Sequence, residues 1–232
     1  MKTDRKTSII VGILFILGTL SGFTGAFVLL GPLLGEPLDL ANIAAHRDQL
    51  TLGALLILLM GFALAMVPAL MFPVFRKHNE ALALAYLVFR GALETAAYIA
   101  SAVGFLVLGT LSREFLQAGA PAGAHFSTLG ALLLEGNDWI GAVTSIVFSI
   151  SALLFNFLLL RTRLIPRWLS VWGFAGAVLY LAQPLLFMFG ITWEFLFFPL
   201  ALQEMVMAVR LIAKGFNKSA PALSSSAQGA AV

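Results

Sequence analysis

The chain has 232 residues, of which 60% are hydrophobic and 11% charged, with a formal net charge of +3. Soluble domains carry about 45–50% apolar and about 25% charged residues, so this composition excludes a soluble protein and predicts an integral membrane protein. The absence of cysteine excludes disulfides, thiolate metal sites and thiol nucleophiles. Because the basic residues fall in short loops, we expect the lipid bilayer as a partner and no nucleic acid.

Six segments are long and apolar enough to cross a bilayer, which takes about 20 residues. In chain order they are 9–30, 50–75, 81–108, 139–160, 168–189 and 195–212. The sequence therefore predicts an all-α fold, a polytopic domain of six transmembrane helices over residues 9–216. We expect residues 1–8 to form a cytoplasmic N-terminus and the small, polar residues 217–232 to form a disordered cytoplasmic tail.

The first segment follows three basic residues and resembles a signal peptide. Its apolar run continues to about Leu34, well beyond the usual length of a signal peptide core, which favours a first helix that is retained. Cleavage near Ala26 is the alternative.

The charges in the connecting loops predict the orientation. Eleven of the 14 Lys and Arg residues flank the segments on one side, whereas Arg47 and Arg113 lie on the other. The eleven are Lys2, Arg5, Lys6, Arg76, Lys77, Arg161, Arg163, Arg167, Arg210, Lys214 and Lys218. Because positive residues favour the cytoplasmic side, we expect both termini in the cytoplasm.

The two outer loops, 31–49 and 110–138, are long for a compact bundle. Residues 126–135 are compatible with a short interfacial helix, and we expect Asn137 or Asp138 to cap the fourth membrane helix.

Small residues at helical spacing mark the faces on which we expect membrane helices to pack. They are Gly18, Gly22 and Gly25 in the first segment, Gly141, Ser145, Ser149 and Ala152 in the fourth, and Gly173, Gly176 and Ala177 in the fifth. Each of Pro68, Pro184 and Pro199 removes a backbone donor, so we expect a kink at each.

The strongest functional signal is a layer of charge inside the segments. Arg90 lies about 15 Å from the cytoplasmic end of the third segment, and Glu94 is one turn further on the same face. Glu204 lies about 15 Å from the outer end of the sixth segment, so all three fall near the bilayer midplane. A charge there costs about 2.5–3.5 kcal/mol and needs compensation. Accompanying polar residues are Tyr98, Gln183 and Gln203.

Two interpretations of this layer stay open. One is a proton-linked or ligand-binding cavity, with Arg90 as the anchor and Glu94 or Glu204 as the titrating group. Three ionised groups would leave a net charge of −1, so we expect one carboxylate to hold a proton. The other is a buried salt bridge between the third and sixth helices, with Gln203 completing its hydrogen bonds.

An outer-leaflet enzyme is the alternative function, with His46, His125 and Asp138 as weak candidates for metal ligands. These residues show no fixed ligand spacing such as HExxH, and the chain has no GxSxG elbow or phosphate loop. The sequence therefore favours a protein that is not an enzyme and needs no cofactor or metal. A structural or regulatory membrane partner is the third hypothesis, while the small-molecule ligand and the oligomeric state stay open.

Five stretches of the chain carry a resemblance to a known family. They are 5–14, 77–86, 129–139, 163–173 and 202–217, and the most specific is Arg163-Leu-Ile-Pro-Arg-Trp-Leu-Ser170. Together they resemble the bacterial multi-pass membrane proteins of domain-of-unknown-function family 4386, over about residues 5–217. The resemblance implies a bacterial inner-membrane protein with one six-helix domain, and it supplies no catalytic residue, ligand or partner.

Overall fold

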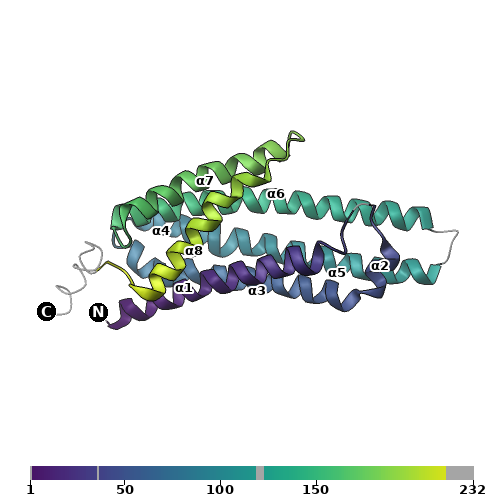
Figure 1. Cartoon of the computed structure of the whole chain (residues 1–232), viewed down its shortest axis with the longest axis horizontal. Helices are drawn as coiled ribbons and strands as arrows, with labels where there is room; N and C mark the ends of the chain where they lie inside the picture. Colours follow the sequence, from purple (N-terminus) through teal and green to yellow (C-terminus); the bar gives the residue numbers. More distant parts are fainter. Residues whose placement is uncertain (1, 36, 119–122, 218–232) are drawn as a thin grey trace. The chain divides into compact units, whose positions relative to one another are not determined.

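The computed structural model describes residues 2–35, 37–118 and 123–217, and the chain is helical along nearly all of that length (Figure 1). The elements are α1 (Lys2–Phe23), η1 (Thr24–Leu30), α2 (Leu40–Ala45), α3 (Arg47–Phe75), α4 (Glu80–Tyr86), η2 (Leu87–Leu93), α5 (Glu94–Ala118), α6 (Gly123–Thr162), α7 (Arg167–Phe187), η4 (Glu194–Phe197) and α8 (Phe198–Ala213). Segments η1 and η2 are π-helical, and η4 is a 3-10 helix. The described residues contain no strand. The predicted disordered tail lies outside the described residues, apart from Asn217.

Among the described residues, six helical runs are long and apolar enough to cross a membrane. They are Arg5–Leu30, Arg47–Phe75, Glu80–Ala118, Gly123–Thr162, Arg167–Phe187 and Phe195–Ala213. Each contains one of the six predicted segments or nearly all of it, so the prediction of an all-α protein with six membrane-spanning helices is confirmed.

The predicted outer loop over residues 110–138 is wrong. Helix α5 continues to Ala118 and α6 begins at Gly123, so the expected interfacial helix is the first part of α6. Asn137 lies inside α6, where its Nδ2 atom donates to the Ser101 carbonyl at 3.3 Å, and Asp138 also lies inside the helix, so neither caps it. Hydropathy locates the apolar part of a helix, whereas Ala, Leu and Glu extend it in polar surroundings through their helix propensity.

The other predicted outer loop, over residues 31–49, is partly helical. Helix α2 is capped by Asp39, whose Oδ1 atom accepts from the backbone N–H groups of Ala41 at 2.9 Å and Asn42 at 3.1 Å. Near the start of α3, Gln49 donates from Nε2 to the Leu29 carbonyl at 2.8 Å. Side chains thus satisfy backbone groups that the short helix α2 and segment η1 would otherwise leave open.

The chain divides into two compact units, each assembled from separate stretches. Unit 1 comprises Met1–Leu17, Ala63–Thr95 and Thr144–Val232, and unit 2 comprises Gly18–Phe62 and Ala96–Val143. Helices α1, α3, α5 and α6 each contribute residues to both units.

Unit 2 has a core of leucine and isoleucine side chains. Its buried members are Leu30, Leu33, Leu40, Ile43, Leu50, Ile57 and Leu108. A Cβ added to Gly25 would lie 3.0 Å from Leu56 Cβ and 3.1 Å from the Gly53 carbonyl oxygen, so η1 approaches α3 closely. This confirms Gly25 as a packing position. Gly141 was expected to be another, but a Cβ there would meet nothing within 4 Å, so that prediction is wrong.

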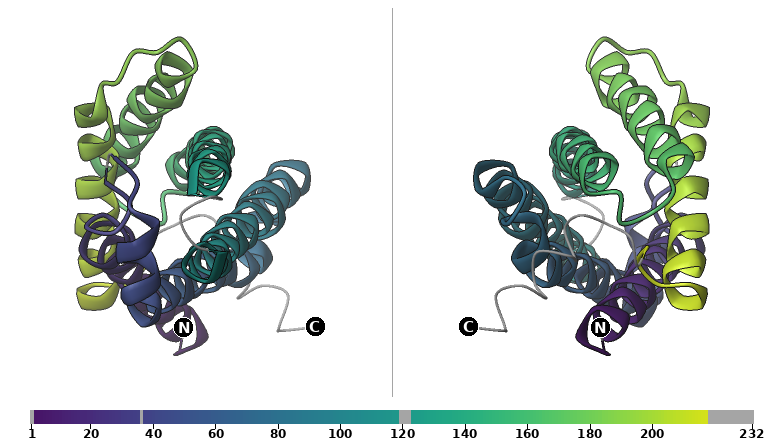
Figure 2. Two further views of the ribbon diagram at one scale, coloured as in Figure 1. Left: turned by 90° about the vertical axis from the view of Figure 1, so that its right-hand side faces the viewer. Right: turned by 90° about the vertical axis from the view of Figure 1, so that its left-hand side faces the viewer.

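Unit 1 packs its helices through small residues. Helices α7 and α8 run side by side (Figure 2), and a Cβ added to Gly176 would lie 3.1 Å from the backbone of Leu200. A Cβ on Gly12 of α1 would lie 2.7 Å from the Ala208 carbonyl of α8. Because lipid gives helices no hydrophobic reason to associate, these close approaches supply the van der Waals contact that holds them together.

An aromatic cluster forms part of the core of unit 1. The ring of Phe155 from α6 stacks on Tyr86 with centroids 5.1 Å apart, and it also contacts Phe15 at 5.7 Å and Phe75 at 6.0 Å. These rings therefore link α1, α3, α4 and α6, and all four side chains are buried.

Of the three prolines at which we expect a kink, two lie inside helices, Pro68 in α3 and Pro184 in α7. Pro199 instead lies in the first turn of α8, because the preceding residues form the 3-10 segment η4. Backbone N–H groups in a first turn have no partner within the helix, so Pro199 costs α8 no hydrogen bond and the reason for expecting a kink there is wrong.

Candidate functional site: a buried arginine–glutamate cluster

Arg90 lies in the π-helical segment η2, within the first third of the third membrane-spanning run. At the end of this segment the Glu94 N–H donates to the Phe89 carbonyl, five residues back instead of four. Such π-helical turns inside α-helices are frequent at functional sites. Gly91 follows Arg90, and a Cβ there would lie 3.5 Å from Pro68 Cγ, so α3 packs closely against this segment.

The nearest charge to Arg90 is Glu94. Its Oε1 and Oε2 atoms lie 3.2 Å and 3.3 Å from Arg90 Nη1, and the two side chains are 2% and 1% exposed. This is a charge-assisted contact with almost no access to solvent or lipid.

The second carboxylate comes from α8. Glu204 Oε1 lies 3.8 Å from Arg90 Nη2, and the Glu204 side chain is 15% exposed. That distance is within the range of an ion pair but too long for a hydrogen bond. The structure therefore brings Arg90, Glu94 and Glu204 together inside unit 1, with the two carboxylates in unequal positions.

Two aromatic rings complete the surroundings of the guanidinium. Arg90 Cζ lies 4.7 Å from the ring centroid of Phe148 and 6.0 Å from that of Phe15. Phe148 is in turn held edge-on to Tyr180, with centroids 4.8 Å apart and an interplanar angle of 71°. The negative faces of such rings stabilise a cation that has lost its water.

Ser151 adds a hydroxyl near Glu94. Its Oγ atom lies 2.8 Å from the Phe148 carbonyl and 3.4 Å from Glu94 Oε2. A hydroxyl has one proton to donate, and the shorter distance favours the carbonyl. The Ser151 hydroxyl therefore stabilises the Glu94 carboxylate less than the closer Arg90 guanidinium does.

Gln203 is fully buried, yet the hydrogen bonds of its amide lead away from Arg90. Its Nε2 atom donates to the Leu169 carbonyl at 3.1 Å and lies 3.4 Å from Asn156 Oδ1. Asn156 itself donates to the Ala152 carbonyl at 2.9 Å, and Gly173 lies against both amides. Gln203 thus joins a neighbouring amide cluster between α6, α7 and α8, in which its own Oε1 atom has no hydrogen-bond partner.

The other two predicted site residues are Gln183 and Tyr98. Gln183 is half-buried on α7, and the described residues give its side chain no hydrogen bond. Tyr98 belongs to unit 2, where a Cβ on Gly61 would lie 3.1 Å from its ring. A role for either residue in the site stays a prediction.

Sequence reasoning missed the aromatic residues of this site. Tyr86 precedes Arg90 by four positions and is within electrostatic reach of all three charges, so helical spacing could have found it. Phe15 and Phe148 could not be found in this way, because nothing in the sequence distinguishes them among 20 phenylalanines.

The weak candidates for an outer metal site do not form a cluster in the part of the chain that the structure describes. Within the described parts of the chain, no three His, Cys, Asp or Glu residues lie close enough to hold a metal ion. His46 instead ends α2, with its Nδ1 atom 3.0 Å from the Asn42 carbonyl, while His125 and Asp138 lie on α6. The hypothesis of an outer-leaflet enzyme required these three residues to lie together as metal ligands, so the structure does not favour it.

Six long apolar helices, with a charged cluster buried inside two of them, define a helical multi-pass membrane protein. The chain belongs to the family described as Domain of unknown function (DUF4386), whose model matches residues 10–215. This confirms the resemblance seen in the sequence. None of the curated proteins matches this chain, and neither does any solved structure.

Proposed function

We propose that this membrane protein takes up and releases a proton at the Arg90–Glu94–Glu204 cluster, and that this exchange is coupled to the binding or transport of a small molecule. The observation that carries the proposal is the unequal sharing of one guanidinium by two carboxylates, at 3.2 Å and 3.8 Å.

The charges support proton exchange because the cluster is not neutral when all three groups are ionised. One cation and two carboxylates leave a formal charge of −1, which is costly at this depth. A proton on one carboxylate removes that cost. Glu204 is the better carrier because it lies further from Arg90 and is more exposed than Glu94.

The surroundings support a group that changes its charge without disturbing the fold. The titratable and charged groups around Glu204 are Arg90 from η2, Glu94 from α5, Tyr86 from α4 and Tyr180 from α7. Arg90 keeps Glu94 and two aromatic rings as partners whatever the state of Glu204. In this proposal Arg90 also anchors a polar or anionic group of the small molecule.

Proton flux into vesicles tests the proposal. Wild-type protein, Glu204→Gln and the control Glu135→Gln, which alters an exposed carboxylate on α6, are reconstituted with a pH-sensitive dye inside. A potassium gradient with valinomycin then drives protons. We expect flux with the wild type and the control, and at least a tenfold loss with Glu204→Gln.

A second measurement tests whether the protein binds a small molecule together with a proton without transporting either. The melting temperature of each variant is followed from pH 5 to pH 9, with and without a panel of small metabolites. If Glu204→Gln matches the wild type in proton flux, in pH dependence and in every ligand-induced shift, the cluster is a structural ion pair and the proposal fails.

We further propose that the protein resides in the cytoplasmic membrane of a bacterium with both termini in the cytoplasm. The excess of Lys and Arg at the loops on one side supports this orientation. The carboxylates of the cluster then lie between a cytoplasmic and an external face, as exchange across the membrane requires.

A further inference from the structure

Unit 1 also contains a pocket that shares no residue with the buried cluster. A pocket of about 600 Å³ opens beside the turn between α3 and α4 and the turn between α6 and α7. Its polar lining consists of His78, Asn79, Arg161, Arg163 and Arg167. Three arginines and a histidine thus line one pocket, and none of the residues that line it is acidic.

One wall of the pocket is apolar. Leu82 from α4 and Leu158 and Leu160 from α6 form it, together with Phe157. Arg161 Cζ lies 5.6 Å from the ring centroid of Phe157, which holds this guanidinium beside the wall. The pocket therefore combines cationic residues with an apolar surface, and this combination favours an amphipathic anion as the ligand.

The turn that carries Arg163 is fixed from a distant part of the chain. Arg163 has a φ of 55°, a left-handed conformation that is uncommon for a residue with a side chain. Its carbonyl accepts from Asn217 Nδ2 at 2.9 Å, and the Leu164 carbonyl accepts from the Asn217 N–H at 2.8 Å. Arg210 donates to Asn217 Oδ1 at 2.6 Å, so the end of α8 holds this turn in place.

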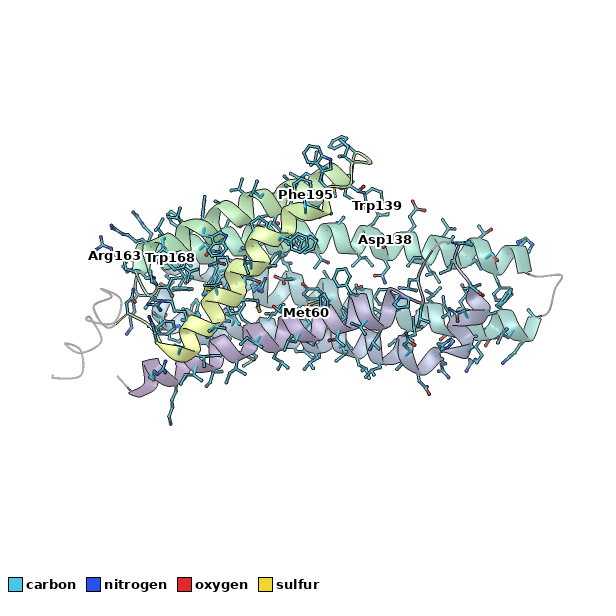
Figure 3. All side chains as sticks on the ribbon, viewed as in Figure 1. Met60, Asp138, Trp139, Arg163, Trp168 and Phe195 are labelled. Atoms are coloured by element: carbon cyan, nitrogen blue, oxygen red, sulfur yellow. The ribbon has the colours of Figure 1, made fainter. Side chains whose placement is uncertain are left out.

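Neighbouring tryptophans indicate the depth of the pocket in the membrane. Trp168 follows Arg167 at the start of α7, is 58% exposed and stacks on Trp172 with centroids 6.2 Å apart. Figure 3 shows Arg163 and Trp168 at the same end of unit 1. Exposed tryptophans favour the level of the lipid headgroups, and basic pockets between helices at that level bind anionic headgroups.

We propose that this pocket binds a phosphate group, with Arg161 and Arg167 as its principal cations. The source that the location favours is the headgroup of an anionic lipid, whose acyl chains would follow the apolar wall. A free phosphate compound offers the same chemistry, so the experiment separates the two. The proposal is independent of proton exchange at Glu204, since no residue is shared between the two sites.

The test uses full-length protein in nanodiscs or detergent. Binding of phosphatidylglycerol, phosphatidylcholine and inorganic phosphate is measured by native mass spectrometry and by the shift in melting temperature. The variant Arg161→Gln/Arg167→Gln removes two cations, and Arg161→Lys/Arg167→Lys keeps their charge. Arg113→Gln is the control, because Arg113 is an exposed arginine of unit 2 paired with Glu114.

We expect phosphatidylglycerol to bind the wild type, the lysine variant and Arg113→Gln, and to bind the double glutamine variant about 30-fold more weakly, since each arginine near a lipid surface contributes roughly fivefold. Phosphatidylcholine should not distinguish the variants. If inorganic phosphate also binds the double glutamine variant about 30-fold more weakly than the wild type, the phosphate site is supported and its ligand is a free phosphate compound. If neither anion distinguishes the double glutamine variant from Arg113→Gln, the proposal is overturned.

Discussion

Nη2 of Arg90 lies 3.8 Å from Oε1 of Glu204, which joins the third and the last membrane-spanning runs through a pair of opposite charges. Arg90 makes a shorter contact with Glu94 on its own run, at 3.2 Å. Glu94 therefore makes a closer contact with Arg90 than Glu204 does, and removing either carboxylate should have a different effect on stability.

Glu94→Gln should destabilise the protein much more than Glu204→Gln. Removing the close partner of a buried charge costs about 3–5 kcal/mol, because the other charge is left poorly compensated. Glu204→Gln instead keeps the shorter contact of Arg90 with Glu94 at 3.2 Å, whereas Glu94→Gln leaves Arg90 only the carboxylate at 3.8 Å, so for Glu204→Gln we expect a change of about 1 kcal/mol or less. Unfolding in mixed micelles, followed by circular dichroism, measures both. Equal losses in the two variants would contradict the unequal roles.

Phe148→Leu should weaken the site through the guanidinium. The ring lies 4.7 Å from Arg90 Cζ and also contacts Tyr180, so we expect a loss of about 2–3 kcal/mol in stability. The matched control is Phe157→Leu, whose exposed ring lies 5.6 Å from Arg161 and should cost less than about 1 kcal/mol. The same unfolding experiment compares them, and a control that costs as much as Phe148→Leu would exclude a special role for that ring.

Gly173→Ala should perturb the amide cluster of α6, α7 and α8. A Cβ at this position would collide with the side chains of Asn156 and Gln203, both of which are buried. Overpacking of this kind costs about 1–3 kcal/mol. Gly141→Ala is the control, because a Cβ there meets nothing within 4 Å and the better helix former should leave stability unchanged or raise it by up to about 1 kcal/mol. Thermal unfolding of the two variants shows whether stability follows the steric contacts of the new Cβ or the higher helix propensity of alanine.

Asn217→Ala should loosen the turn that carries Arg163. The substitution removes the bonds from Asn217 Nδ2 to the Arg163 carbonyl and from Arg210 to Asn217 Oδ1. We expect a loss of about 1–3 kcal/mol and faster hydrogen exchange over residues 163–166. Hydrogen exchange with mass spectrometry measures the local effect, with Lys214→Ala as the control. Unchanged protection of this turn would show that the Asn217 side chain does not hold it.

Single cysteines can test the proposed orientation, since the chain has none of its own. Lys77→Cys reports on the basic side and Arg113→Cys on the opposite side, and both positions are exposed. In intact cells we expect a membrane-impermeant maleimide to label Arg113→Cys only. In inverted membrane vesicles it should label Lys77→Cys only. The reverse pattern would overturn the orientation and place both termini outside.

The sequence by itself determined the class of this protein and its membrane-spanning helices. Crossing an apolar layer takes about 20 apolar residues with all backbone bonds satisfied within the helix, so composition and segment length are enough to locate the six runs. Counting along the helices also put Arg90, Glu94 and Glu204 at a common depth, because the rise per residue is fixed.

Only the tertiary structure decided what these residues contact. The rotation of each helix and its packing against neighbours select Phe148 as the ring over Arg90 and direct the amide of Gln203 toward Leu169, and neither can be read from hydropathy. Hydropathy also failed to predict where the helices begin and end, since α6 begins at Gly123, well before its apolar part. Depth follows from one helix alone, whereas side-chain contact depends on how several helices pack together.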